Sequence, residues 1–268
     1  MADTSYALTY PQLALQCIDR GLENPGLRRV RETCEFMERM ADGLFRAQGV
    51  PFSCHLVRTA SIVLSTGASL PVVQAALVHS AYRLSRFRDS RRRPPRTAHR
   101  RELRAILGSD VEALVYAYEQ LPWYRAEVLD RHISALESMP ETMRKALLIR
   151  LADELEDWLD LALAFKDNQQ VACRIDAYGE RCIRLAELMA LGELAESMRG
   201  AAARYRDLQL PGEIILHRNR VYERPRRHLW ERSTPETWLL AGARRIVRSL
   251  RKHPASRRPD NSRDKKFP

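Results

Sequence analysis

Apolar residues recur every three or four positions along most of the first 200 residues, the spacing of helices that bury one face. This spacing predicts helices over residues 24–48, 53–66, 69–80, 102–115 and 175–198. The longest apolar stripe follows Pro140 and consists of Met143, Leu147, Leu151, Leu155, Trp158 and Ala162. No alternating strand pattern precedes Gly212, and residues 213–222 are the candidate for a short strand or hairpin. We therefore expect an all-α fold.

Capping residues and prolines mark the expected ends of these helices. Residues 86–98 contain the run Arg-Arg-Arg-Pro-Pro, which interrupts any helix because proline lacks an N–H group and clashes with the preceding turn. We expect an exposed loop there. The expected N-terminal caps are Asn24, Ser53 and Ser69. Proline lies in the first turn after two of them, as Pro25 after Asn24 and Pro71 after Ser69.

The positive charge is concentrated in two places. The chain has 268 residues and a formal net charge of +11, but residues 218–268 alone hold 16 Lys or Arg against 5 Asp or Glu. The rest of the chain is therefore neutral overall. Within it, residues 83–104 hold ten arginines against two acidic residues. The sequence thus predicts a balanced body with one basic loop and a basic tail.

Composition narrows the class of protein. Hydrophobic residues make up 45% of the chain, which is enough for a substantial core and excludes global disorder. No apolar run reaches the roughly 18–20 residues that span a bilayer, and residues 1–10 show no pattern of a secretory signal. The five cysteines form no CxxC pair, which favours a reducing cytoplasm over a disulfide framework or a cysteine-built zinc site.

Three residues remain as candidates for chemistry once the common motifs are set aside. The sequence contains no GxGxxG, Walker loop, GxSxG or HExxH motif. His55, His79 and Asp153 each fall on a different predicted helix, and two imidazoles with one carboxylate can converge on a divalent metal. A histidine on an apolar helix is also common as a satisfied core residue, so spacing alone leaves both interpretations open.

The segments around these residues resemble a known family. Residues 46–55 (RAQGVPFSCH), 74–79 (QAALVH), 102–115 (ELRAILGSDVEALV), 148–157 (LIRLADELED) and 185–196 (LAELMALGELAE) follow one another in the order and spacing of five segments of one domain. That domain is the hydrolase domain of the guanosine tetraphosphate synthetase/hydrolase family. The resemblance covers roughly residues 27–199. It implies an HD-superfamily helical domain, in which a His, a His-Asp doublet and a distant Asp bind a metal that activates water against a phosphate ester.

The departures from that family fall on its chemistry. Ser80 replaces the doublet aspartate, and a neutral hydroxyl is a poor ligand for a hard divalent ion. The family's Glu-Asp pair is replaced by Arg83 and Leu84, and Asp157 stands where the family has Asn. Residues 79–82 (HSAY), with Phe87 shortly after, are similar to an uncharacterised bacterial HD-related branch in which HS-x-Y replaces the doublet.

The resemblance implies a set of site residues. His55, His79 and Asp153 would form a two-histidine, one-carboxylate site for Mn(II), Fe(II) or Zn(II). A phosphorylated ligand of nucleotide type would contact residues near them, since Arg forks suit phosphate. These expected ligand contacts are Arg46, Ser80, Arg83, Arg86 and Arg150. For the arginine loop itself, a solvated insertion remains as an alternative to a phosphate-binding rim.

The tail predicts a second kind of contact. A helix is expected to begin at Thr234-Pro235-Glu236 and to carry one apolar face and one basic face. Such a helix binds an anionic membrane surface or an acidic protein, or packs on the body with its charges in solvent. Sequence-specific nucleic-acid binding is not expected, because no recognition motif accompanies the charge. The basic residues of the expected helix are Arg244, Arg245, Arg248, Arg251 and Lys252.

These observations lead to one leading hypothesis and its alternatives. We expect an N-terminal segment over residues 1–23, an HD-like helical domain over 24–210 and a basic extension over 211–268. The leading hypothesis is a cytoplasmic, metal-dependent phosphohydrolase-like protein that acts on or holds a phosphate of nucleotide type, and attachment of the tail to the inner membrane face is left open. The main alternative is a catalytically inactive HD pseudoenzyme that binds or scaffolds, which Ser80 and the missing carboxylates favour. An iron-dependent oxygenase is a third, weaker possibility.

Overall fold

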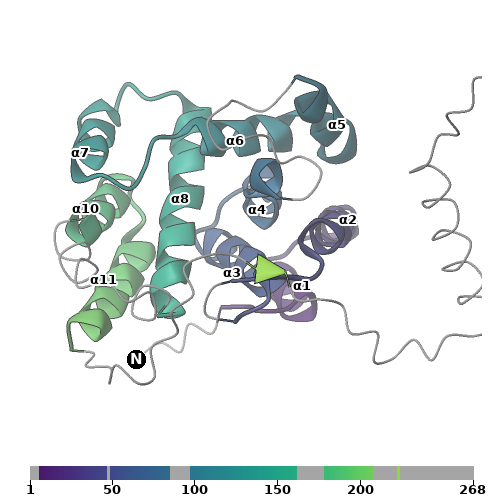
Figure 1. Ribbon diagram of the computed structural model, residues 1–268, viewed down its shortest axis with the longest axis horizontal. Helices are drawn as coiled ribbons and strands as arrows, with labels where there is room; N and C mark the ends of the chain where they lie inside the picture. The colour runs from purple at the N-terminus through teal and green to yellow at the C-terminus, as the bar shows by residue number, and fades with distance from the viewer. Residues whose placement is uncertain (1–5, 47–48, 85–96, 162–177, 208–221, 224–268) are drawn as a thin grey trace, which may run out of the picture. The chain divides into compact units, whose positions relative to one another are not determined.

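The protein is all-α, as the hydrophobic pattern predicts (Figure 1). The computed structural model describes residues 6–46, 49–84, 97–161, 178–207 and 222–223. All of these belong to one compact unit, Met1–Arg224, and the second unit, Pro225–Pro268, lies outside the described residues. Within the described residues no helix is long and apolar enough to cross a membrane.

Helix α8, Glu141–Leu159, is the centre of the fold. It packs against α3 (Phe52–Ser65), α4 (Leu70–Leu77), α6 (Ser109–Gln120), α10 (Glu180–Leu188) and α11 (Gly192–Asp207). In Figure 1 it stands upright between α3 and α4 on one side and the α10–α11 pair on the other. Its predicted apolar stripe is confirmed, because Leu147, Leu151 and Leu155 are fully buried and Trp158 nearly so. Burial of each such side chain contributes about 1.5–3 kcal/mol.

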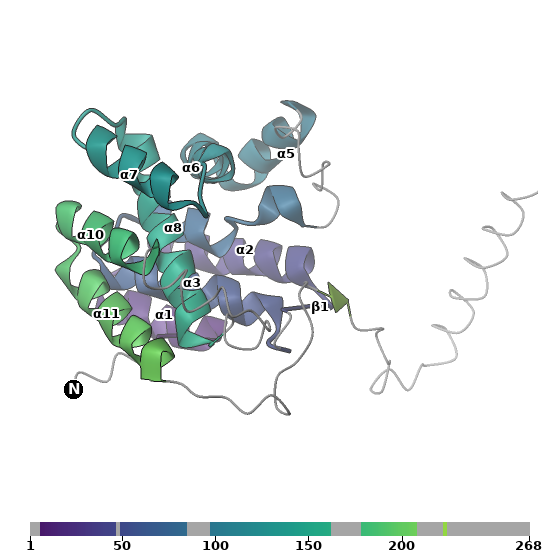
Figure 2. The ribbon, with the colours of Figure 1, turned by 60° about the vertical axis from the view of Figure 1, so that its left-hand side comes forward.

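The N-terminal helices form a second layer against α3. Helix α1, Tyr10–Asp19, and α2, Asn24–Ala41, pack on each other and on α3 (Figure 2). The sequence pattern did not predict α1, yet Leu13 and Cys17 on it are completely buried. The residues before Asn24 therefore contribute to the core of the helical domain.

Two of the three expected helix caps are displaced, one by one residue and the other by two. Helix α2 begins at Asn24 with Glu23 as its cap, and α3 begins at Phe52 with Pro51 as its cap, so Asn24 and Ser53 lie inside their helices. Ser69 holds the expected cap position of α4, with Pro at the first turn. The helices start where proline fixes the backbone.

Helix α4 ends earlier than predicted. The pattern extends it through His79 and Ser80, but it stops at Leu77 and a tight turn follows, leading into the short 3-10 helix η1, Ala81–Arg83. The reason is local competition for an acceptor. In a continuing helix the carbonyl of Ala76 would accept from the N–H of Ser80, but here it lies 2.7 Å from Nδ1 of the His79 side chain. His79 therefore projects from a turn.

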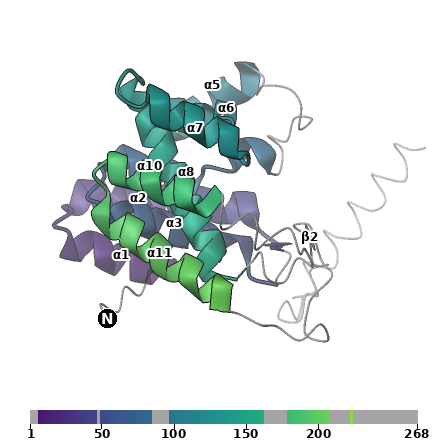
Figure 3. The ribbon, with the colours of Figure 1, turned by 90° about the vertical axis from the view of Figure 1, so that its left-hand side faces the viewer.

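The predicted helix over residues 175–198 is two helices. Within the described part of that range, α10 ends at Leu188 and α11 begins at Gly192. Between them Ala190 adopts a left-handed backbone with φ 59°, and the N–H of Leu191 bonds to the carbonyl of Ala186 at 2.9 Å. This is a Schellman ending with alanine where glycine is usual. The pair runs side by side in Figure 3.

The remaining elements complete the unit. The range 102–115 is divided at Gly108 between α5, Thr97–Leu107, which starts before the expected Glu102, and α6. Helix α7, Ala126–Ala135, was not predicted. Strand β1, Leu44–Phe45, pairs antiparallel with β2, Tyr222–Glu223, at the end of the candidate hairpin. The rest of that candidate, residues 213–221, and the arginine-rich residues 86–96 lie outside the described residues.

Candidate metal centre

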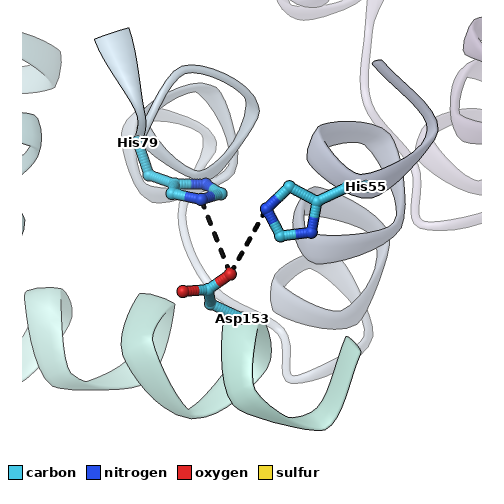
Figure 4. A group of neighbouring side chains, drawn as sticks. All are labelled: His55, His79 and Asp153. Carbon is cyan, nitrogen blue, oxygen red and sulfur yellow. Dashed lines mark ion pairs between the residues drawn. The ribbon is translucent and has the colours of Figure 1, made fainter. Parts of the chain in front are cut away.

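His55, His79 and Asp153 converge, as Figure 4 shows. His55 comes from the first turn of α3, His79 from the turn after α4, and Asp153 from the middle of α8. One carboxylate oxygen, Oδ1 of Asp153, lies 3.3 Å from Nε2 of His55 and 3.6 Å from Nε2 of His79. Both histidines are buried, and the Asp153 side chain is 16% exposed.

The other nitrogen of each imidazole is held by a separate acceptor. Nδ1 of His79 donates to the carbonyl of Ala76 at 2.7 Å, and Nδ1 of His55 lies 2.5 Å from Oε2 of Glu156. These contacts place a proton on Nδ1 of each ring. They leave both Nε2 lone pairs directed at the same point, which is the arrangement of metal-binding histidines.

Glu156 is shared between His55 and Arg46. Nη1 of Arg46 lies 2.6 Å from the Oε2 atom that contacts His55, and Nη2 of Arg46 bonds to Asp157. Nη1 also lies 2.5 Å from Nδ1 of His55, but two N–H donors cannot bond to each other, so the carboxylate accepts from both. Glu156 and Asp157 follow Asp153 by three and four residues and so share its face of α8.

A tight turn places Arg46 at this position. The N–H of Arg46 bonds to the carbonyl of Val50 at 2.8 Å, and the N–H of Gly49 bonds back to the carbonyl of Arg46 at 2.9 Å. Gly49 has φ 93°, a backbone conformation that a side chain would strain. His55, Glu156 and Asp157 also satisfy the spacing of a metal site, but the Arg46 guanidinium already supplies the cation there.

The second oxygen of Asp153 is fixed from the opposite side. The hydroxyl of Tyr118, on α6, donates to Oδ2 at 2.6 Å, and Nη1 of Arg150 lies 3.6 Å from the same atom and 2.7 Å from the Tyr118 oxygen. The Arg150 guanidinium is buried and stacks on the Tyr118 ring at 3.7 Å. Asp153 therefore turns Oδ1 alone toward the histidines.

Electrostatics keep these ligands in the form that metals bind. Burial lowers the pKa of His79 to about 4, so its ring is neutral at pH 7. Burial alone would raise the pKa of Asp153, but His79, His55 and Arg150, with the Tyr118 hydrogen bond, hold it well below its usual range. The group thus combines a neutral imidazole and an ionised carboxylate at neutral pH.

The residues expected to contact a ligand occupy different surroundings. Arg150 lies beside the triad, whereas Arg46 is committed to Glu156 and Asp157. Ser80 is buried directly after His79, and Arg83 is 43% exposed and donates to Glu119 at 2.7 Å. Whether these side chains touch a ligand stays a prediction. Arg86 and the basic tail residues 244–252 lie outside the described residues.

Several residues of the centre were not predicted. Glu156 and Tyr118 were missed, although the position of Glu156 three residues after Asp153 is a readable signal on a helix. Tyr82, the last residue of the HS-x-Y motif, also has a structural role. Its hydroxyl donates to Oε1 of the fully buried Glu112 at 2.8 Å, which ties the turn that carries His79 to α6.

Comparison with families of known proteins links part of the chain to a domain family. The family model described as "Domain of unknown function (DUF6817)" matches residues 36–122, about a third of the chain. The matched range includes His55, His79 and Ser80 and stops before Asp153. No curated protein matches the chain.

Proposed function

We propose that this protein is a divergent HD-type, metal-dependent phosphohydrolase-like protein that acts on a phosphate or pyrophosphate of nucleotide type. His55, His79 and Asp153 would hold the metal. The observation that carries the proposal is that both Nε2 atoms face one oxygen of Asp153 while both Nδ1 atoms are bonded elsewhere. A core histidine whose hydrogen bonds are made within the protein does not need its second ring nitrogen to face the same oxygen as another histidine.

The distances support a first-row transition metal. Bonds of about 2.0–2.1 Å in tetrahedral geometry put neighbouring ligand atoms about 3.4 Å apart. The two Nε2–Oδ1 distances, 3.3 and 3.6 Å, lie close to that value. Zn(II), Mn(II) and Fe(II) all accept two imidazoles and one carboxylate, with open positions for water or substrate. A metal bound there would lower the pKa of a water ligand and polarise a phosphoryl oxygen.

The charges around the centre favour an anionic ligand. Asp153 and Arg150 face each other, and Glu156 is balanced by Arg46. Arg46 also pairs with Asp157, and Arg58 lies between Glu156 and Asp160, so a divalent ion would leave the centre with a net charge of about +1, which a phosphate anion neutralises and a neutral amide or ester does not. This balance supports phosphate as the group that the site binds.

A catalytically inactive HD module is the second candidate. Ser80 replaces the doublet aspartate, and the carboxylates described around the triad already have donors: Glu156 is bonded by His55 and Arg46, and Glu154 accepts from Trp123, Trp158 and Tyr178. No general base is therefore evident among the described side chains. In this case the centre would bind metal and phosphate without turnover.

The metal content of the purified full chain tests the proposal. We expect about one equivalent of Mn, Fe or Zn by elemental analysis, and less than a tenth of that in His79→Ala and Asp153→Ala. Asp130→Asn is the matched control, since this exposed carboxylate pairs with Arg181 and lies on α7 away from the triad. No metal in the wild-type protein, even after incubation with Mn(II), Fe(II) or Zn(II), contradicts the proposal.

Turnover separates the two candidates. Metal-loaded protein is incubated with nucleoside diphosphates and triphosphates, and released phosphate and pyrophosphate are measured. Release that disappears in Asp153→Ala supports the hydrolase, and stoichiometric binding of the same nucleotides without release supports the inactive module.

The basic tail supports a second, separate contact. Its composition favours an anionic membrane surface, and co-sedimentation with phosphatidylserine vesicles tests this. We expect full-length protein to bind and a variant with Arg244, Arg245, Arg248 and Arg251 changed to Gln to lose at least tenfold in binding. Equal sedimentation of both contradicts membrane attachment.

A further inference from the structure

Tyr124 is an exposed aromatic residue in a strained conformation beside the metal centre. It lies between α6 and α7 with φ 67°, in the left-handed region that bulky side chains rarely adopt. Its side chain is 51% exposed, whereas Leu121 and Trp123 before it are buried and anchor the segment. Trp123 is fixed further, because its indole N–H donates to Glu154 at 3.1 Å. The segment thus holds Tyr124 outward in a left-handed backbone conformation, whose conformational energy would be lower for Gly or Asn.

The side chain of Tyr124 reaches the surroundings of the triad. Its ring centre lies 5.9 Å from the guanidinium carbon of Arg150, the same group that contacts Asp153. Burial around the phenol oxygen raises the pKa of Tyr124, and the negative charge of Asp153 raises it further. The ring therefore lies near the arginine that borders the triad, while about half of the residue is open to solvent.

Contact with Arg150 accounts for only part of the Tyr124 ring, because half of the residue is exposed. Other large apolar side chains exposed in the described residues are aliphatic and lie elsewhere, such as Leu15 and Ile18 on α1. Strain that packing does not require is typical of positions kept for binding. An open aromatic ring beside a cationic, metal-binding centre has the chemistry to stack on a planar heterocycle whose phosphate reaches that centre.

We propose that Tyr124 is a specificity-determining residue that stacks on the base of a nucleotide held at the His55–His79–Asp153 centre. This inference rests on the proposed function and narrows its ligand to phosphates that carry an aromatic ring. The metal at that centre would take the anionic part, the buried Arg150 adds positive charge beside it, and Tyr124 distinguishes ring-bearing from ringless phosphates.

Two matched, non-hydrolysable probes test the inference in the full chain. Adenosine 5′-(α,β-methylene)diphosphate carries the ring, and methylenediphosphonate is the same P–C–P group without it. Calorimetric titration with each probe is done for wild type, Tyr124→Phe and Tyr124→Gly, after incubation with Mn(II). We expect Tyr124→Gly to lose about tenfold or more in affinity for the nucleotide analogue, since stacking on one base supplies an effect of that size. We expect it to keep methylenediphosphonate binding within twofold, and Tyr124→Phe to resemble wild type with both probes.

Thermal stability distinguishes a binding role from a structural one. Ala190→Gly is the control for relief of a left-handed backbone, because Ala190 is exposed with φ 59° and lies between α10 and α11. We expect the Tm of Tyr124→Gly to stay at or above that of wild type, as for Ala190→Gly. A fall of more than about 3 °C would identify the ring as structural and overturn the inference.

The remaining outcomes are also decisive. Equal loss of both probes in Tyr124→Gly, or no loss of either, overturns the role of the ring. So does wild-type protein that binds the nucleotide analogue no more tightly than methylenediphosphonate. Metal content is measured on the same samples. If the protein is free of metal and its nucleotide binding still depends on Tyr124, the result supports this inference and contradicts the proposed metal site.

Discussion

Replacing Glu156 with Gln should weaken metal binding through His55 without removing a ligand. Glu156 is almost fully buried and contacts His55, Arg46 and Arg58. Burial alone would raise its pKa, but these three partners hold it below the ordinary value, so the group is a carboxylate at neutral pH. Glu156→Gln keeps the shape and one acceptor oxygen and removes the negative charge that makes the imidazole a stronger ligand.

The size of the effect follows from two separate losses. Partners that orient a metal-bound histidine typically contribute 10–100-fold in metal affinity, about 1.4–2.7 kcal/mol. Breaking a buried ion pair costs about 3–5 kcal/mol of folding free energy. Because Arg46 and Arg58 retain Asp157 and Asp160 as partners, we expect the lower end, about 3 kcal/mol. For a domain of this size that lowers the Tm of metal-free protein by about 6–12 °C.

Competition with a chromophoric chelator at pH 7.5 measures the metal affinity, and calorimetry measures the Tm. Asp160→Asn is the matched control, because Asp160, the residue that follows α8, pairs with Arg58, the same arginine that contacts Glu156. We expect it to lower the Tm and to keep metal affinity within twofold. Equal losses of affinity in Glu156→Gln and Asp160→Asn, or wild-type affinity in Glu156→Gln, would refute the orienting role.

Three further predictions test the centre, a buried charge cluster and the core. Metal at 100 times its dissociation constant should stabilise wild type by about 2.7 kcal/mol and raise its Tm by about 5–10 °C in scanning fluorimetry, and Asp153→Ala should show no rise. Arg100 and Arg104 hold the pKa of Glu112 below its ordinary value against the opposing effect of burial, so its stabilisation is present above the unfolded pKa of about 4.5 and is lost as the pH falls through the lower folded value. Urea unfolding of Glu112→Gln should therefore show a deficit of about 3 kcal/mol at pH 7 that shrinks toward pH 3, and a constant deficit would contradict the linkage. Leu151→Ala should lose about 2–5 kcal/mol with an unchanged denaturant slope, because Leu151 is completely buried in α8, and a loss under 1 kcal/mol would contradict its place in the core.

Helical periodicity predicted those helices that pack on their neighbours through one continuous apolar stripe. The helix after Pro140 is the clearest case, since α8 buries its stripe along most of its length. The errors occur where a single hydrogen bond decides the structure. The side chain of His79 takes the carbonyl that would have extended α4, and a left-handed Ala190 ends α10 without glycine. Such choices depend on side chains and backbone conformations that periodicity does not report.

The sequence predicted the candidate metal ligands more completely than the residues that hold those ligands in position. His55, His79 and Asp153 were found because they fall in segments that resemble one known domain, and the structure brings them together. The partners that orient them come from elsewhere in the fold. Tyr118 lies on α6, a helix that was predicted from its apolar spacing alone, with no sign of a polar role for the tyrosine. The carbonyl of Ala76 is a backbone group, so the identity of the residue does not predict its contact with His79. Glu156 alone carried a signal, in its three-residue spacing from Asp153.

If the resemblance to the HD superfamily holds, Ser80 in place of the doublet aspartate would alter the charge of the proposed centre more than its shape. Two histidines and Asp153 still meet, because the turn after α4 is held by Tyr82 and Glu112, and the position of Asp153 is fixed by Tyr118 and Arg150. A second carboxylate would bring a divalent centre close to neutrality, whereas serine leaves it positive beside a buried arginine. Such a centre gains attraction for a phosphate and loses affinity for its metal. The same substitution therefore favours holding a phosphorylated ligand over rapid turnover, and an exposed Tyr124 at the edge of the site is consistent with selection among such ligands.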